Sequence, residues 1–249
     1  MVIGRILSPS DVKAIRDIAG HLAFREGKES AGGLVARVKK NQQAVNSEEV
    51  AGILATVPKR LSEHPKFTSA TRPKAFVNML MSRYDTGGTY GWHVDNAMMG
   101  GARTDISFIL FLNDRQSYDG GSLMIRDTLE TRQIKLEAGD LILDPPTTLH
   151  HVEPVTRGQR LVILGWVQSL IARADQHEIL FDLDRAIDSI ASPEPTEAQD
   201  LLSKTRSNLL RRLVDCQALR PPADGIWRAL SPACQDTRFC GKIRPIRKR

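Results

Sequence analysis

The sequence predicts an α+β fold in which a β-rich barrel or sandwich is preceded and followed by helices. Residues 75–168 hold short apolar or alternating segments separated by turns such as "DTGG", "SYDGG" and "EAGD". Strands at roughly 8–12-residue spacing with Gly/Asp turns are typical of all-β sandwiches and barrels. No helical pattern of about 10–15 residues interrupts them, which argues against a doubly wound parallel sheet. On both sides of this segment, apolar residues recur every three or four positions, as they do in amphipathic helices.

Two helices are expected before the β-rich segment. The first begins after Ser8, with Pro9 at the first helical position and Asp11 in the first turn, and these residue types favour a helix N-terminus. The second spans 47–62, "SEEVAGILATVPKRLS". Pro58 is expected to kink or end this second helix, because proline lacks a backbone N–H and clashes with the preceding turn. The run "GGLVARVKKNQQAV" between the two helices is more typical of strand or loop.

Two more helices are expected after the β-rich segment, in a C-terminal extension over 169–216. The run "PTEAQDLLSKTRSNLLRRLVD" opens with Thr196 and Gln199 at capping-box spacing. The run before it, "DQHEILFDLDRAIDSIA", carries an apolar stripe at three- and four-residue spacing, formed by Ile179, Leu183, Ile187 and Ile190. This helix pair could pack on its own barrel or form a homodimer interface, and its pattern fits both.

The basic character of the chain comes from its C-terminal end. The net charge is +6, and residues 216–249 hold eight Lys/Arg and two Asp/Glu. The 27 basic and 27 acidic residues of 1–215 therefore balance. A basic tail could bind nucleic acid with an affinity that falls steeply with salt, but the balanced body disfavours a nucleic-acid partner.

All three cysteines, Cys216, Cys234 and Cys240, lie in the same C-terminal segment. Their spacing matches no zinc motif, and three cysteines make no disulfide framework. The stretch 217–249 has prolines, scattered aromatics and no hydrophobic period. We therefore expect a weakly structured tail with free thiols.

The chain is expected to be cytoplasmic. Its first residues, "MVIGRILSPSDVKAIRD", reach a proline and two acidic residues before any apolar run long enough for a signal-peptide core. No stretch approaches the roughly 18 consecutive apolar residues of a membrane span. No membrane partner is therefore expected.

A metal site is indicated by the stretch "GTYGWHVDNA", residues 88–97. Side chains two apart on a strand point to the same face, so His93 and Asp95 can project together into a barrel. A third ligand is needed, and His150 and His151 lie on a strand late in the β-rich segment. Two imidazoles and one carboxylate form the facial triad of non-haem Fe(II) oxygenases, which keeps coordination positions open. A structural zinc site would close its fourth position with protein, and no cysteine in the body can do so.

An Fe(II) enzyme that uses 2-oxoglutarate also needs a cation for the far carboxylate of that cosubstrate. Arginine is preferred because its guanidinium forms two parallel hydrogen bonds to a carboxylate. The run "VTRGQRLVILGW" offers Arg157 and Arg160. Arg157 adjoins Gly158 in a predicted turn, whereas Arg160 begins an apolar strand and can point inward. We therefore favour Arg160.

Several motifs that occur in order together resemble one family. They are "VKKNQQ", "RYDTGGTYGWHVDNAMM", "RTDISFILFLND", "YDGGSLMI" and "AGDLILDPPTTLHHVEPVTRGQRLVILGWVQS". The likeness runs from about residue 3 to 215 and is to the bacterial PKHD-type hydroxylases. These are iron- and 2-oxoglutarate-dependent oxygenases related to prolyl 4-hydroxylases and often associated with iron-uptake genes.

The resemblance implies a double-stranded β-helix, or jelly roll, within a dioxygenase domain over 1–168. It also implies Fe(II) on His93, Asp95 and His150, 2-oxoglutarate on Arg160 and Tyr84, and L-ascorbate as a further cofactor. Neighbours on a strand face opposite ways, so at most one of His150 and His151 joins the triad. Only the resemblance favours His150, because the family's ligand directly follows the leucine of this run.

The implied function is hydroxylation of an unidentified small-molecule or peptide substrate, linked to iron or siderophore metabolism. An alternative keeps the barrel and changes the activity: a cupin-like protein that binds a metal without oxygenase chemistry. The alternative predicts no affinity for 2-oxoglutarate, so that Arg160→Ala would leave function intact.

Overall fold

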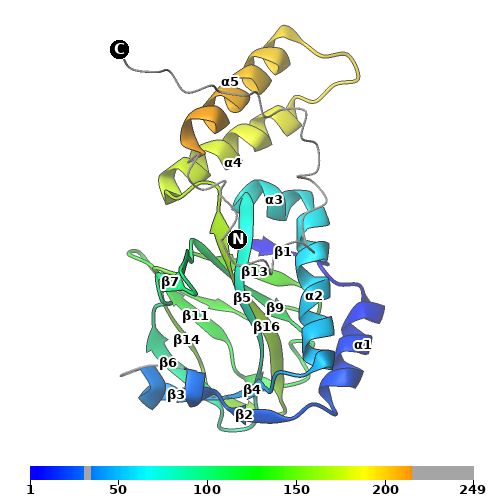
Figure 1. Cartoon of the computed structure of the whole chain (residues 1–249), viewed down its shortest axis with the longest axis vertical. Helices are drawn as coiled ribbons and strands as arrows, with labels where there is room; N and C mark the ends of the chain where they lie inside the picture. The colour runs from blue at the N-terminus through cyan, green and yellow to red at the C-terminus, as the bar shows by residue number, and fades with distance from the viewer. Residues whose placement is uncertain (31–34, 215–249) are drawn as a thin grey trace, which may run out of the picture. The chain divides into compact units, whose positions relative to one another are not determined.

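The computed structural model describes residues 1–30 and 35–214, and its strands build two main antiparallel sheets (Figure 1). The larger sheet has the strand order β1 (Val2–Ile3), β13 (Leu141–Asp144), β9 (Ile106–Phe111), β16 (Arg160–Ser169), β5 (Pro73–Tyr84), β4 (Gln42–Ala44) and β2 (Phe24–Glu26). The smaller sheet has the order β12 (Thr131–Ile134), β11 (Leu123–Arg126), β14 (Leu149–Val152), β6 (Thr89–His93) and β3 (Lys39–Lys40). Two short pairs complete the strands: β10 (Asp119–Gly120) with β15 (Val155–Arg157), and β7 (Met98–Met99) with β8 (Ala102–Arg103).

Helices lie before and after the β-rich segment as the sequence predicts, and one further helix, Pro65–Thr71, was not predicted. They are α1 (Pro9–Ala19), α2 (Glu48–Glu63), α3 (Pro65–Thr71), α4 (Ala174–Ser189) and α5 (Glu197–Leu213), with two 3-10 helices at Gly27–Ser30 and Val35–Val38. Ser8 caps α1 through a capping box with Asp11. Pro58 does not end the helix, because α2 continues through this buried residue to Glu63. Packing of the helix against the sheet offsets the hydrogen bond that proline removes.

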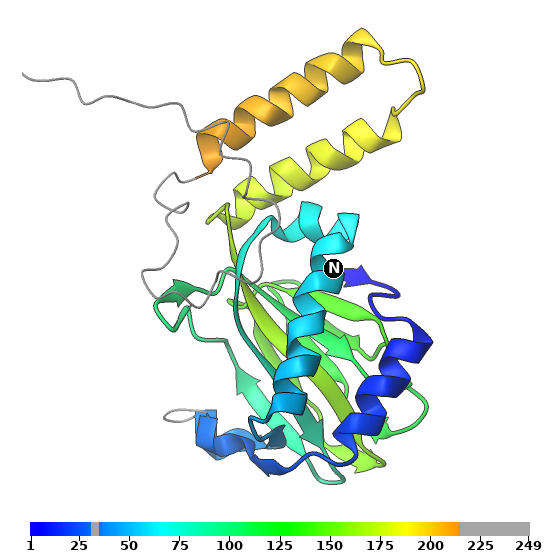
Figure 2. The ribbon, with the colours of Figure 1, turned by 45° about the vertical axis from the view of Figure 1, so that its right-hand side comes forward.

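Two hydrophobic clusters hold the layers together. In the first, α1 and α2 cover one face of the larger sheet (Figure 2), and Val12, Val57 and Leu61 pack with Phe108 and Ile163. The second cluster fills part of the space between the two sheets, and its buried members are Tyr84, Phe111, Leu123, Ile125, Ile142, Val152, Val155 and Val162. The space that this second cluster leaves open holds the candidate site.

The segment 39–44 joins the two sheets. Lys39 and Lys40 pair with β6 of the smaller sheet, whereas Gln42 and Gln43 pair with β5 of the larger sheet. The chain therefore crosses from one sheet to the other within a few residues. Successive side chains of this extended segment face alternately toward the interior and away from it.

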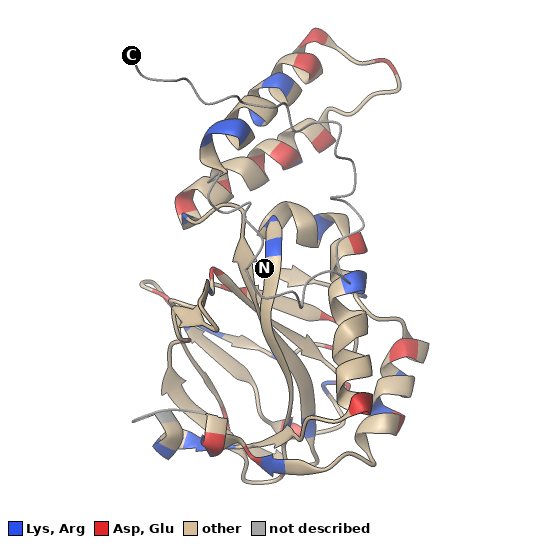
Figure 3. Cartoon of the chain, viewed as in Figure 1, with Lys and Arg blue, Asp and Glu red and all other residues tan. Residues whose placement is uncertain are grey.

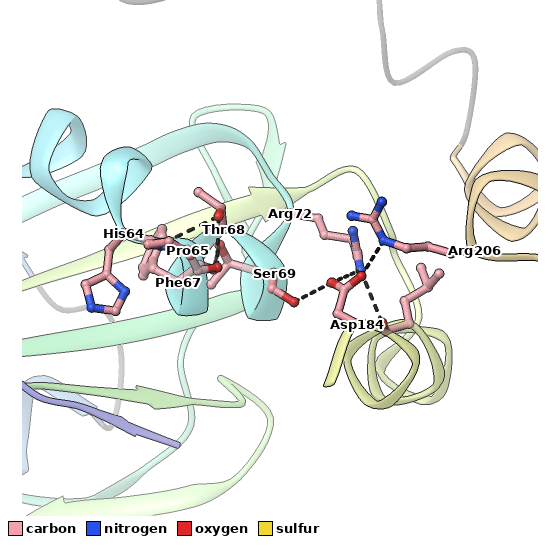
Figure 4. Close-up of polar contacts among 10 residues, drawn as sticks. His64, Pro65, Phe67, Thr68, Ser69, Arg72, Asp184 and Arg206 are labelled. Carbon is pink, nitrogen blue, oxygen red and sulfur yellow. Dashed lines mark hydrogen bonds and ion pairs between the residues drawn. The ribbon is translucent and has the colours of Figure 1, made fainter. Parts of the chain in front are cut away.

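The C-terminal helix pair is fastened to the rest of the fold by a buried polar network (Figure 4). Asp184 of α4 accepts a hydrogen bond from Arg72 Nη2 at 2.7 Å and further ones from Ser69 Oγ and Arg206 Nε. The same Arg72 nitrogen also donates to the Leu180 carbonyl oxygen at 3.3 Å. The buried face of α4 thus runs through Leu180 and Asp184. The predicted apolar stripe matches this face only in part: Leu183 and Ile187 are half-buried, whereas Ile179 and Ile190 are exposed.

Asp184→Asn is expected to destabilise the docking of the helix pair by about 2 kcal/mol, because the charged acceptor of two arginines is lost. Hydrogen exchange should show lower protection across 174–213 with little change in β9 and β16. Asp182→Asn is the matched control, since Asp182 lies on the exposed side of α4. Equal protection in the two variants would contradict a fastening role for Asp184.

Charged residues of both signs are interspersed over the described elements (Figure 3). The basic surplus and the three cysteines lie in 216–249, outside the described residues, so the predictions for the tail remain predictions. Among the residues that the structure describes, no helix combines the length and the hydropathy that crossing a bilayer requires.

Candidate metal and cosubstrate site

An irregularity in β6 turns two side chains of that strand into the space between the sheets. His93 is the register partner of His150, and Tyr90 is the partner of Val152, so three steps along β6 match two along β14. Such a bulge inserts one extra residue and re-aims side chains. Gly91 lies within it, and a Cβ there would stand 2.7 Å from Cβ of Val38. Tyr90 and His93 consequently both line the cavity, and their rings stack at 3.7 Å between centroids.

The structure brings His93, Asp95 and His150 together. One ligand atom from each residue lies within 4.8 Å of the others, and no other such cluster of three occurs among the described residues. His150 Nε2 lies 3.8 Å from Asp95 Oδ1. All three side chains line one cavity of about 450 Å³ between the sheets.

Hydrogen bonds orient each of these three side chains. Nδ1 of His93 donates to the Gly91 carbonyl at 2.8 Å, and Nδ1 of His150 donates to the Thr148 carbonyl at 2.9 Å. In the neutral form of either imidazole, Nε2 is therefore the nitrogen that is free to bind a metal. Trp166 Nε1 donates to Asp95 Oδ2 at 2.9 Å, which leaves Oδ1 facing His150.

The electrostatic surroundings keep His93 neutral. Burial, followed by the neighbouring His150, lowers the pKa of His93 to about 4. A neutral imidazole is the form that coordinates a metal. The buried carboxyl of Asp144 also lines the cavity, and burial raises its pKa to about 6.

The structure separates the two adjacent histidines of β14. His150 is buried and faces His93, with ring centroids 4.3 Å apart. His151 lies against Trp92, with ring centroids 4.1 Å apart, and the Arg126 guanidinium lies 4.2 Å from the same indole. Trp92 is partly exposed and does not line the cavity. The two imidazoles thus point to opposite faces of the smaller sheet.

Arg160 lies in the same cavity as the three candidate ligands. It is 1% exposed, and its Nε and Nη2 have no hydrogen-bond partner among the described residues. Its guanidinium carbon lies 5.0 Å from the ring centre of Tyr84, its register partner on β5. Burial raises the pKa of Tyr84, so its hydroxyl stays protonated. Arg157, the other candidate, lies outside the cavity and pairs with Asp119 at 2.7 Å.

Sequence reasoning missed several residues that line the cavity. Lys39, Asn41 and Gln43 alternate along the segment that joins the two sheets, and all three face inward. The strict spacing of two was the available signal, but the run is too short and too polar to be recognised as a half-buried strand. For Asp144 and Trp166, the neighbouring sequence contains no pattern that predicts a position in the cavity.

Comparison with known proteins assigns the chain to a class. The model of the 2OG-Fe(II) oxygenase superfamily matches residues 79–168, the stretch that holds all three candidate ligands and Arg160. In fold, the chain is similar to HygX from Streptomyces hygroscopicus, solved with nickel and 2-oxoglutarate bound. The TM-score is 0.52 at 12% identity, covering 69% of this chain and 84% of that one. A 2OG-Fe(II) oxygenase family oxidoreductase from Burkholderia pseudomallei gives a TM-score of 0.50 at 16% identity, covering 68% and 83%.

Sequence relatives narrow the class to one family. A PKHD-type hydroxylase of Maricaulis maris is 42% identical over 209 residues, which cover 84% of this chain and 95% of that protein. A PKHD-type hydroxylase of a Picosynechococcus species is 43% identical over 211 residues, covering 84% and 96%. The chain belongs to the PKHD-type hydroxylases. It is a 2-oxoglutarate-dependent dioxygenase that uses Fe(II), and the cupin-like alternative without oxygenase activity is set aside.

Proposed function

We propose that His93, Asp95 and His150 hold Fe(II) and that Arg160 and Tyr84 bind 2-oxoglutarate, for the hydroxylation of a small-molecule or peptide substrate. The observation that carries the proposal is the convergence in one cavity of three ligand atoms and a buried guanidinium, two nitrogens of which have no partner in the described part of the chain. Burial of a cation without a partner costs free energy, and a bound anion offsets that cost. The distal carboxylate of 2-oxoglutarate fits that need.

The chain's own residues supply binding, orientation and exclusion of water. Fe(II), when bound, supplies the oxidative chemistry that couples O2 to decarboxylation of 2-oxoglutarate. His93 and His150 offer Nε2, and their Nδ1 hydrogen bonds to backbone carbonyls fix the ring orientation. Arg160 anchors the far end of the cosubstrate, so that the keto-acid end is held toward the metal ligands.

We also infer that the two facing sheets are the halves of a double-stranded β-helix. The antiparallel orders β13-β9-β16-β5 and β11-β14-β6, with a cavity between the sheets, support this assignment. In this arrangement the candidate ligands come from β6, from the residues just after it and from β14, while Arg160 begins β16.

For the primary substrate, we propose only a chemical class. A structure of HygX, which shares the fold at a TM-score of 0.50, was solved with hygromycin B bound, and this supports a small molecule as one candidate. The association of PKHD-type hydroxylases with iron-uptake genes supports a link to iron or siderophore metabolism.

The test is incorporation of oxygen into a product. Anaerobically purified protein would be loaded with Fe(II) and 2-oxoglutarate, mixed with metabolite and peptide pools, and exposed to ¹⁸O2. We expect succinate together with a product that carries one ¹⁸O atom, and neither in His93→Ala. Succinate formation without any labelled product across pools of iron chelators, amino-acid derivatives and peptides would contradict the hydroxylase assignment for these classes.

Trp166→Phe is expected to lower the affinity for Fe(II) by about tenfold while the protein stays folded. The substitution removes the hydrogen bond to Asp95 Oδ2 and keeps an aromatic side chain. Loss of a group that hydrogen-bonds to a metal ligand weakens metal binding by about this amount. Anaerobic Fe(II) titration measures the change. Trp92→Phe is the matched control, because that indole lies outside the cavity. Equal affinity in the two variants would show that the Trp166 bond does not orient Asp95.

A further inference from the structure

Lys39 is a second cation in the cavity, separate from Arg160. It pairs in register with Tyr90 on β6, whereas Arg160 pairs with Tyr84 across β16 and β5. The Lys39 Nζ atom lies 5.0 Å from the ring centre of Tyr90. Because Tyr90 stacks on His93, Lys39 lies one aromatic ring away from a candidate metal ligand.

Within residues 1–30 and 35–214, the ammonium group of Lys39 forms no ion pair with an acidic side chain. Its only hydrogen-bond acceptor in these residues is Ser30 Oγ at 3.1 Å. An ammonium has three donors, so this one acceptor leaves hydrogen-bonding capacity toward the cavity. The negative charge of Asp95 raises the pKa of Lys39 without forming an ion pair with it.

Burial makes this arrangement costly in the absence of a ligand. The pKa of Lys39 is lowered to about 8 by burial. At neutral pH the ammonium is still mostly charged. Its partial removal from water therefore raises the free energy of the folded protein, and no ion pair compensates for it within the described residues. An anion bound from the cavity would offset that cost.

Two polar side chains next to Lys39 line the same wall of the cavity. Asn41 and Gln43, two and four residues further along, also face the cavity, and Asn41 Nδ2 donates to Ser82 Oγ at 2.6 Å. Asn41 Oδ1 is buried without a partner among the described residues. One wall of the cavity therefore presents an ammonium and two amides, while Arg160 already provides for the cosubstrate.

We propose that Lys39 binds a carboxylate of the primary substrate and so selects acidic substrates for this site. This inference rests on the proposed function, because it assumes that Arg160 takes the distal carboxylate of 2-oxoglutarate. The bond is a charge-assisted hydrogen bond from Nζ to a carboxylate oxygen, made on the Tyr90 side of the candidate ligands.

The test compares acids with their neutral amides on the anaerobic Fe(II) and 2-oxoglutarate complex of the full chain. The probes are N-acetylglycine, N-acetylleucine and N-acetylproline with their carboxamides, and a capped tripeptide with central Asp against the same peptide with Asn. Dissociation constants come from calorimetry under nitrogen. We expect at least one acid to bind about tenfold or more tightly than its amide. The peptide pair distinguishes a side-chain carboxylate from a free small acid.

The preference should vanish in Lys39→Met and persist in Lys39→Arg. Lys40→Met is the matched control, since Lys40 is the exposed neighbour that does not line the cavity. The 2-oxoglutarate dissociation constant should stay within about twofold in Lys39→Met. A tenfold rise would overturn the inference by assigning Lys39 to the cosubstrate, and so would the absence of any preference for acids in the native chain. If 2-oxoglutarate itself fails to bind the native chain, the proposed function fails instead.

Discussion

Arg160→Ala is expected to weaken 2-oxoglutarate binding by at least about 100-fold, since removal of one partner from a buried charge pair costs several kcal/mol. The guanidinium is almost fully buried, and two of its nitrogens have no partner within residues 1–30 and 35–214. Its loss therefore removes no ion pair made within this part of the chain. Calorimetric titration of 2-oxoglutarate into the Fe(II)-loaded protein under nitrogen gives the affinity directly.

Arg157→Ala provides the matched control for this measurement. Arg157 lies three residues away, is exposed, and pairs with Asp119 outside the cavity. Its removal should leave the affinity for 2-oxoglutarate unchanged. If Arg160→Ala binds 2-oxoglutarate as tightly as the native chain, the cosubstrate is held by another group, and Lys39 becomes the first alternative.

His150→Ala is expected to lower the affinity for Fe(II) by more than about 100-fold, because loss of a ligand exceeds the roughly 10–100-fold effect of losing a group that hydrogen-bonds to a ligand. His151→Ala should retain native affinity, since that imidazole packs against Trp92 on the other face of the sheet. The two variants remove the same side chain from adjacent positions, so each serves as the control for the other. Fe(II) binding to His150→Ala but not to His151→Ala would reverse the assignment.

The outline of the fold could be predicted because its signals are local. Ser8, Pro9 and Asp11 specify the start of α1 within four residues, and the structure has the capping box there. Features that depend on distant partners were missed. Pro58 stays inside α2 because the helix is buried against the sheet at that point. Asp184 forms the buried face of α4 only because Arg72, far away in the sequence, neutralises it.

Prediction of the candidate site was limited in the same way. The spacing of His93 and Asp95 is local, so the pair could be identified from the sequence. The bulge at Gly91 depends on pairing with β14 and could not be foreseen. Strand alternation shows that His150 and His151 face opposite ways but does not show which one faces inward. Lys39 could not be recognised, because its interior position follows from a strand that crosses between two sheets.

The most direct test of this account is a crystal structure of the Mn(II) and 2-oxoglutarate complex, grown without oxygen. We predict Mn(II) at about 2.0–2.3 Å from His93 Nε2, Asp95 Oδ1 and His150 Nε2. The distal carboxylate of 2-oxoglutarate should contact Arg160 Nε and Nη2, with Lys39 left facing the remaining space. Metal bound at His151, or a distal carboxylate that contacts Lys39 in place of Arg160, would contradict the account.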